Sequence, residues 1–119
     1  MLADTPNPPP AHLKLNTYKL EDATVVECHG RLTLEHAARL KSEVKGMIPA
    51  HKRIILDLEE LIFMDSSGLG TIVGLYISAR GSGCRIEIVN MSGPIRKLFA
   101  LSQLLSVFEE CGRSGMRMP

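Results

Sequence analysis

The sequence predicts a small single-domain α/β fold, in which three main helices cover a mixed β-sheet in the order β-β-α-β-α-β-α-β. Three observations lead to this prediction. The chain has 119 residues, which is enough for one hydrophobic core. Its hydrophobic share of 45% and charged share of 23% are typical of a folded globular protein. Short β-branched runs alternate with segments of helical periodicity, an order that favours parallel strands joined by right-handed crossovers.

The first two strands are expected to form a hairpin. Residues 12–19 alternate loosely between apolar and polar side chains, and the run ATVVECHGRL at 23–32 is rich in β-branched residues. The hairpin turn is expected near Glu21 and Asp22.

A helix and a central strand are expected next. Thr33 can cap the helix, and Pro49 stops it. The apolar positions of this helix recur at helical spacing: Ala37, Leu40, Val44, Met47 and Ile48. Residues 53–58 form a short apolar run with a charged start, which is typical of a strand buried on both faces at the centre of a sheet.

The segment 61–64 is too apolar for an open loop and too short for an independent strand or helix, so we expect it to pack beneath the sheet's edge. The next helix is the most clearly patterned, with one expected buried stripe: Leu69, Ile72, Val73, Tyr76 and Ile77. Residues 80–83, Arg-Gly-Ser-Gly, are expected to end it.

A further strand is predicted at 85–89. Ser92 and Pro94 then suit the start of a third helix, whose periodic positions are Ile95, Leu98, Phe99 and Ser102. Residues 105–108 are expected to form a short last strand. The domain is predicted to span residues 12–110, between a disordered proline-rich leader (1–11) and a flexible tail (111–119).

Charge and hydropathy argue against several classes of partner. The 14 Lys and Arg against 13 Asp and Glu give a net charge of +1, which favours neither nucleic acid nor an anionic membrane surface. The longest uncharged run, residues 66–79, has 14 residues and is too short to span a membrane. The N-terminus lacks the features of a secretion signal, so we expect a cytoplasmic protein.

The cysteine and histidine residues are scattered. Cys28, Cys84 and Cys111 are odd in number and far apart, which indicates reduced thiols rather than a disulfide framework. Cys28 and His29 are adjacent in a predicted strand and should point to opposite faces, so they cannot chelate one ion. We expect no metal site and no cofactor.

One segment carries possible chemistry: Asp65-Ser66-Ser67-Gly68, between an apolar connector and the start of the best-defined helix. Unpaired backbone N–H groups at a helix N-terminus favour an anion, so this segment is either an anion site or a phosphoacceptor. The alternative is that Asp65 or Ser66 is only a helix cap, which contributes about 1 kcal/mol. The residues alone leave these interpretations equally open.

An enzymatic role is not expected. The serines do not lie in a Gly-x-Ser-x-Gly nucleophile elbow, and no histidine follows His51 to complete a triad that begins with serine. The glycines at 68 and 70 match neither a dinucleotide-binding pattern nor a phosphate-binding loop.

The run FMDSSGLG at 63–70, preceded by ILDL at 55–58, resembles the signature of the STAS domain (sulfate transporter and anti-sigma factor antagonist), specifically the bacterial anti-sigma factor antagonists. The resemblance extends over roughly residues 12–110 and includes GRL at 30–32 and IRKLF at 95–99. It implies a transcription regulator that, while unphosphorylated, binds an anti-sigma factor, usually a serine kinase of the GHKL type, and so frees the sigma factor. It also implies that Ser67 is the phosphoacceptor and that Asp65 and Ser66 shape the docking loop.

Further residues are assigned to the partner surface. Gly68, Thr71 and an exposed Leu75 are expected to contribute to it. Gly70 and Gly74 either let their helix pack closely or make room for the partner. Thr33 stands where the family usually carries Asp. The alternative function is a non-switching STAS scaffold or regulatory subunit, in a stress-signalling or lipid-transport complex, in which the two serines belong only to a cap.

Overall fold

The computed structural model describes residues 13–103. The predicted leader (1–11), last strand (105–108) and tail (111–119) lie outside the described residues. Within them, the elements follow the order β1, β2, α1, β3, β4, α2, β5, α3, with a short 3-10 turn, η1 (Ile48–Ala50), directly after α1.

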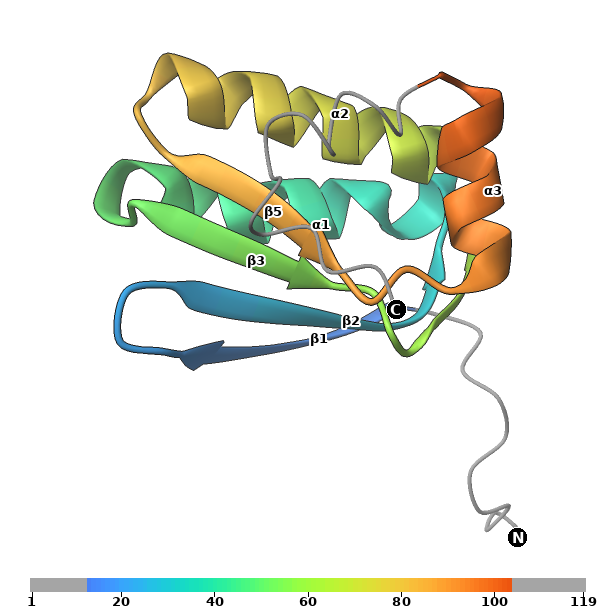
Figure 1. Ribbon diagram of the computed structural model, residues 1–119, viewed down its shortest axis with the longest axis horizontal. Helices are drawn as coiled ribbons and strands as arrows, with labels where there is room; N and C mark the ends of the chain where they lie inside the picture. The colour runs from blue at the N-terminus through green and yellow to red at the C-terminus, as the bar shows by residue number, and fades with distance from the viewer. Residues whose placement is uncertain (1–12, 104–119) are drawn as a thin grey trace, which may run out of the picture.

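In the described part of the chain, five strands form one mixed sheet (Figure 1): β1 (Leu13–Lys19), β2 (Thr24–Leu32), β3 (Arg53–Asp57), β4 (Leu61–Met64) and β5 (Arg85–Val89). Their order is β1-β2-β3-β5, and β4 pairs with the carboxyl end of β2. The β1–β2 pair is antiparallel and the remaining pairs are parallel. The α/β class with a mixed sheet and three helices is therefore confirmed, as is the central position of β3.

The predicted hairpin is also confirmed. The backbone N–H of Leu20 donates to the carbonyl of Ala23 at 2.8 Å and closes the turn that contains Glu21 and Asp22. The register pairs Lys19 with Thr24 and Leu13 with Gly30.

Three helices cover one face and one end of this sheet: α1 (Leu34–Met47), α2 (Ser66–Gly81) and α3 (Gly93–Leu101). Figure 1 shows α1 and α2 lying along the same face, with α3 at the end where the parallel strands stop. The main core lies between helices and sheet and takes alternate residues from the strands, for example Val26 and Cys28 from β2. The intervening residues, such as Glu27, therefore face away from α1 and α2. We call that side the outer sheet face.

Residues 61–64 form a strand, β4, paired with β2, whereas they were expected to pack beneath the sheet's edge as neither an independent strand nor a helix. The reason is non-local: the carboxyl end of β2 continues past the end of β3 and offers its backbone groups to β4. The register shifts at Gly30/Arg31, because Gly30 pairs with Leu61 whereas Arg31 pairs with Phe63. Ile62 is therefore the extra residue of a β-bulge and points into solvent.

The buried stripe of α2 differs from the predicted one. Leu69, Ile72 and Tyr76 are buried as expected, but Leu75 is 2% exposed and Ile77 is 62% exposed. Because α2 is apolar on almost every side, two neighbouring stripes fit the periodicity equally well. The small Ala79, which is fully buried, marks the stripe that lies against the sheet.

The ends of the helices agree with the predictions in part. Pro49 follows α1 within η1, and Gly83, with φ of +75°, follows the end of α2 in the left-handed region that favours glycine. Thr33 lies at the N-cap position of α1, but its hydroxyl makes no capping hydrogen bond, so its predicted capping role was wrong. No helix between residues 13 and 103 combines the length and apolarity that crossing a bilayer requires.

Candidate functional site

The segment Asp65–Ser67 connects β4 to α2 and forms the N-terminus of that helix. Asp65 is the N-cap residue, and its Oδ1 accepts a hydrogen bond from the backbone N–H of Gly68 at 3.0 Å. Ser66 and Ser67 are the first two residues of α2. The prediction that the serines lie at a helix N-terminus is confirmed, and so is the capping role of Asp65.

Asp65 also contacts a second helix. Its Oδ2 accepts a hydrogen bond from the backbone N–H of Leu34, the first residue of α1, at 3.1 Å. One carboxylate thus caps both α1 and α2, which explains why the hydroxyl of Thr33 is not needed as a cap. The N–H of Gly68, followed by that of Leu34, lowers the pKa of Asp65 below its usual value, so this side chain is charged at neutral pH.

Gly68 fixes how closely α2 approaches the sheet. A Cβ at this position would overlap the carbonyl oxygen of Leu32 and would lie 2.8 Å from Leu32 Cγ and 2.9 Å from Met64 Cγ. Gly68 is buried, so its assignment to the partner surface was wrong. It is a packing residue that allows the serines to sit directly above the ends of β2 and β4.

The two serines differ in exposure. Ser66 is exposed, whereas Ser67 is half-buried and lines one end of a groove of about 430 Å³ between α1 and α2. Thr71, one turn later, lines the same groove. On the opposite side the groove is lined by Lys41 and Lys45 of α1. We call this hollow the α1/α2 groove.

Three further residues of α2 line the α1/α2 groove, and their positions show what each one does. Leu75 lines it but is only 2% exposed, so the expectation of a projecting, exposed Leu75 was wrong. Gly70 and Gly74 also line it, and a Cβ at either position would meet no atom within 4 Å. Close helix packing therefore does not require these glycines; they leave the groove open instead.

Two exposed apolar side chains lie on the elements that adjoin Asp65, one at the start of α1 and one in β4. Leu34, whose backbone is bonded to Asp65, is 73% exposed, and the bulge residue Ile62 is 55% exposed. Sequence patterns did not identify these residues or the two lysines as part of the site. Lys41 and Lys45 are four residues apart and therefore share one helix face, but only the packing of α1 beside α2 shows that this face borders Ser67.

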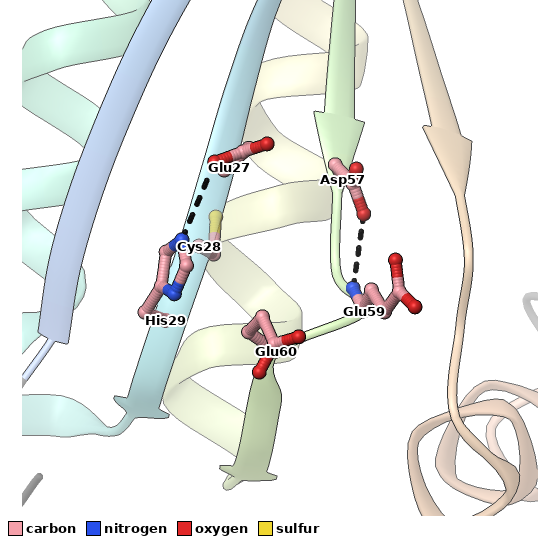
Figure 2. Close-up of a pocket in the computed structure, with 6 residues that line it drawn as sticks. All are labelled: Glu27, Cys28, His29, Asp57, Glu59 and Glu60. Carbon is pink, nitrogen blue, oxygen red and sulfur yellow. Dashed lines mark hydrogen bonds and ion pairs between the residues drawn. The ribbon is translucent and has the colours of Figure 1, made fainter.

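A second hollow lies where β3 ends beside the middle of β2 (Figure 2). It has a volume of about 190 Å³ and is lined by Glu27, Cys28, His29, Asp57, Glu59 and Glu60. Two of its carboxylates, Glu27 and Asp57, have local partners. Glu27 Oε1 lies 3.4 Å from His29 Nε2, and Asp57 Oδ1 accepts hydrogen bonds from the Glu59 backbone N–H at 3.0 Å and from Asn90 Nδ2 at 3.1 Å. We call it the acidic pocket.

The acidic pocket lacks the arrangement of a cysteine nucleophile. Burial, together with the nearby Asp57 carboxylate, raises the pKa of Cys28 to about 12, so the thiol is neutral at physiological pH. Cys28 belongs to the main core, whereas its neighbour His29 pairs with Glu27 on the outer sheet face. Among residues 13–103, no three His, Cys, Asp or Glu side chains are placed to hold a metal ion.

Comparisons with known proteins agree with this geometry. The STAS domain family model matches residues 14–115. Over 56 residues, or 47% of this chain, the sequence is 36% identical to a Paenibacillus polymyxa protein named anti-sigma F factor antagonist, and the match covers 48% of that protein. The chain spans about half the length of the first curated relatives it matches, 48% and 57%.

Solved structures extend the likeness over most of the chain. SpoIIAA, described as an anti-sigma factor antagonist in its unphosphorylated form, aligns with a TM-score of 0.70 and 25% identity, covering 90% of this chain and 87% of that one. The phosphorylated form of the Bacillus cell fate determinant SpoIIAA aligns with a TM-score of 0.66, also at 25% identity, covering 90% of each chain. Since the family model covers most of the sequence and the fold agrees, the chain belongs to the STAS domain family.

Proposed function

We propose that this protein is an anti-sigma factor antagonist. Unphosphorylated, it binds an anti-sigma factor that is a serine kinase of the GHKL type, and thereby frees a sigma factor. Phosphorylation of Ser67 by that kinase ends the binding. The protein acts in the cytoplasm, by binding and not by catalysis of its own. Family membership and the names of its relatives support the general role.

The observation that carries the proposal is the position of Ser67. Ser67 is the second residue of α2 and lies beside the cap Asp65. It is half-buried and lines one end of the α1/α2 groove. The backbone below it is held by the Asp65–Gly68 hydrogen bond and by the close contact of Gly68 with β2. A hydroxyl on such a rigid base presents one defined geometry to a kinase, which is what phosphoryl transfer requires.

The same position suits a charge switch. A phosphate adds about −1.5 to −2 charge and three acceptor oxygens. On Ser67 it would stand beside the ionised Asp65, whose Oδ2 accepts from the backbone N–H of the exposed Leu34. The two hydrogen bonds of Asp65 that hold this turn do not involve the Ser67 hydroxyl, so we expect the fold to persist after phosphorylation. Binding to a partner surface that fits a neutral hydroxyl would be lost.

Incubation with the cognate anti-sigma factor and ATP, followed by mass spectrometry, tests the proposal. We expect a stoichiometric gain of about 80 Da, located on Ser67 by peptide mapping. Ser67→Ala should fold normally and remain unmodified, whereas Ser67→Asp should weaken binding to the anti-sigma factor. Ser66→Ala is the matched control, because it removes the neighbouring, more exposed hydroxyl. A phosphate on any other residue would contradict the assignment.

One observation favours the alternative of a non-switching STAS scaffold or regulatory subunit. Because Asp65 caps two helices, structural need alone accounts for the Asp of the motif. The same experiment separates the two functions: a scaffold would bind its partner equally well as wild type and as Ser67→Asp, and would gain no phosphate from any cognate kinase. Turnover of a substrate by the isolated protein would contradict both.

A further inference from the structure

The α1/α2 groove brings two cations of one helix to the same hollow as the proposed phosphoacceptor of another. Lys41 and Lys45 line it from α1, and Ser67 lines it from α2. We propose that Lys41, assisted by Lys45, binds the phosphate of phosphorylated Ser67 inside this groove. The inference rests on the proposed function only in that Ser67 is the residue modified.

Asp65 already caps the N-terminus of α2, so a phosphate on Ser67 would share that end of the helix with a carboxylate. Asp65 Oδ1 accepts from the N–H of Gly68 at 3.0 Å, and the carbonyl of Asp65 accepts from the N–H of Leu69 at 3.0 Å. Asp65 Oδ2 likewise accepts from the first N–H of α1 at 3.1 Å. A phosphate here meets a carboxylate that it repels, so it requires a cation from elsewhere.

The two lysines can supply that charge. Neither ammonium group forms an ion pair with a carboxylate in the part of the chain that the structure describes. Both residues are exposed, so a phosphate gains their charge without displacing an existing partner. Thr71, which also lines the groove, adds a hydroxyl donor one turn along α2 from Ser67.

Helix geometry ranks the two lysines. The Asp65 carboxylate holds the starts of α1 and α2 at the same level, because it accepts from Leu34 and from Gly68. Side chains of a helix lean toward its N-terminus, so both lysines lean toward the end where Ser67 lies. Lys45 is one turn, about 6 Å, farther from that end than Lys41. Lys41 is therefore the primary ligand and Lys45 the secondary one.

A phosphate held in this way would do more than add charge. It would occupy the end of the groove that Ser67 lines. It would also neutralise the lysines that the unphosphorylated protein displays. Phosphorylation would then change both the shape of the groove at this end and its positive charge on the surface offered to a partner.

Phosphorus-31 NMR tests the proposal on protein with phosphoserine placed at position 67 during translation, without kinase or partner. A nearby ammonium lowers the second pKa of the phosphate, whose ordinary value is about 6. We expect Lys41→Met to raise this pKa by about 0.5. This is the effect expected from removing one positive charge about 5 Å from the phosphate in water. Lys45→Met should raise it less, and Lys41→Arg should leave it at the wild-type value.

Lys52→Met is the matched control, because Lys52 is an exposed lysine that lines a different hollow, beside the hairpin turn. Circular dichroism melts of each variant check that the fold is retained. Superposable titration curves for wild type and Lys41→Met would overturn the proposal, as would an equal change in Lys52→Met or a larger one in Lys45→Met. Such results would leave the proposed function intact, because failure of that function would show as the absence of kinase-dependent phosphorylation.

Discussion

The outer sheet face and the N-terminal end of α2 both carry polar groups, but these groups have different environments. On the outer face Glu87 is buried, with its Oε1 2.9 Å from Arg53 Nη2 and its Oε2 3.4 Å from Arg85 Nε. Arg53 Nη1 also lies 3.3 Å from Asp22 Oδ1. Beside α2 the lysines have no ion-pair partner among residues 13–103, and the serines are accessible. The difference separates charges that hold the fold from charges available to a ligand or partner.

The largest effect is expected from breaking the outer-face ion pair. Among residues 13–103, Arg53→Met leaves the Glu87 carboxylate, 1% exposed, with only the longer contact to Arg85. We expect the free energy of unfolding in urea to fall by about 3 kcal/mol. Anti-sigma factor binding by the folded protein should not change, because this face lies opposite the helices.

The double variant Arg53→Met/Glu87→Met is the control for that prediction, because it removes the buried charge together with its partner. It should regain most of the lost stability. A double variant no more stable than Arg53→Met would show that the residues matter for their shape and not for their charge.

Gly68→Ala tests the close contact beneath the serines. Its Cβ would collide with the Leu32 carbonyl, a backbone atom that cannot rotate away. We expect a loss of about 2 kcal/mol in the free energy of unfolding, measured by chemical denaturation. Stability equal to wild type would mean that α2 shifts freely at this end, contrary to its role as a rigid base for Ser67.

Asp65→Asn tests the shared cap. The amide oxygen can replace one carboxylate oxygen, but the amide nitrogen cannot accept the other hydrogen bond. The expected loss in the free energy of unfolding is about 1 kcal/mol. In Asp65→Ala, which removes both acceptor oxygens, hydrogen exchange should show faster opening of the first turns of both α1 and α2. Faster exchange confined to α2 would contradict the bridge to Leu34.

Gly74→Ala should separate stability from binding. Its Cβ meets no neighbour, and alanine is the better helix former, so the free energy of unfolding should rise by about 1 kcal/mol. The added methyl group enters the α1/α2 groove and should weaken anti-sigma factor binding, measured by calorimetry. Gly46→Ala, also in open space but on α1, is the matched control for the gain in stability. Unchanged binding would exclude the groove from the interface.

The smallest expected effect is on pH dependence. The pKa of Asp65 is lower in the folded protein than its ordinary value of 3.8, so its stabilising contribution is complete above that value. The contribution is lost as pH falls through the lower, folded-state pKa. The stability difference between wild type and Asp65→Asn should therefore shrink below about pH 4. A difference that stays constant down to pH 2 would contradict the charged cap.

Local sequence patterns predicted the hairpin, the central strand and the three helices, because β-branched runs, helical spacing and capping residues act over a few positions. They also placed Asp65 and the serines at a helix start. β4 was missed because a four-residue strand depends on β2, far away in the sequence. The buried side of α2 was missed because its apolar residues surround the helix, and only the position of the sheet selects Leu75 over Ile77.

The contacts around Asp65 and the shape of the α1/α2 groove also depend on tertiary packing. Nothing near Asp65 in the sequence indicates that its second hydrogen bond goes to Leu34, 31 residues earlier. The spacing of Gly70 and Gly74 suited close packing as well as an open groove, and only the empty space above them decides for the groove. Motifs thus placed Asp65 and the serines at the start of α2, whereas the packing of α1 beside α2 determined their neighbours.

Cys28 gives the protein an internal reporter of its own unfolding. The thiol is fully buried in the main core and its pKa is raised to about 12, so alkylating reagents cannot reach a reactive thiolate in the native state. Once the sheet separates from the helices, the side chain regains solvent and an ordinary pKa. The alkylation rate of this one residue then measures how often the domain opens, without any engineered label.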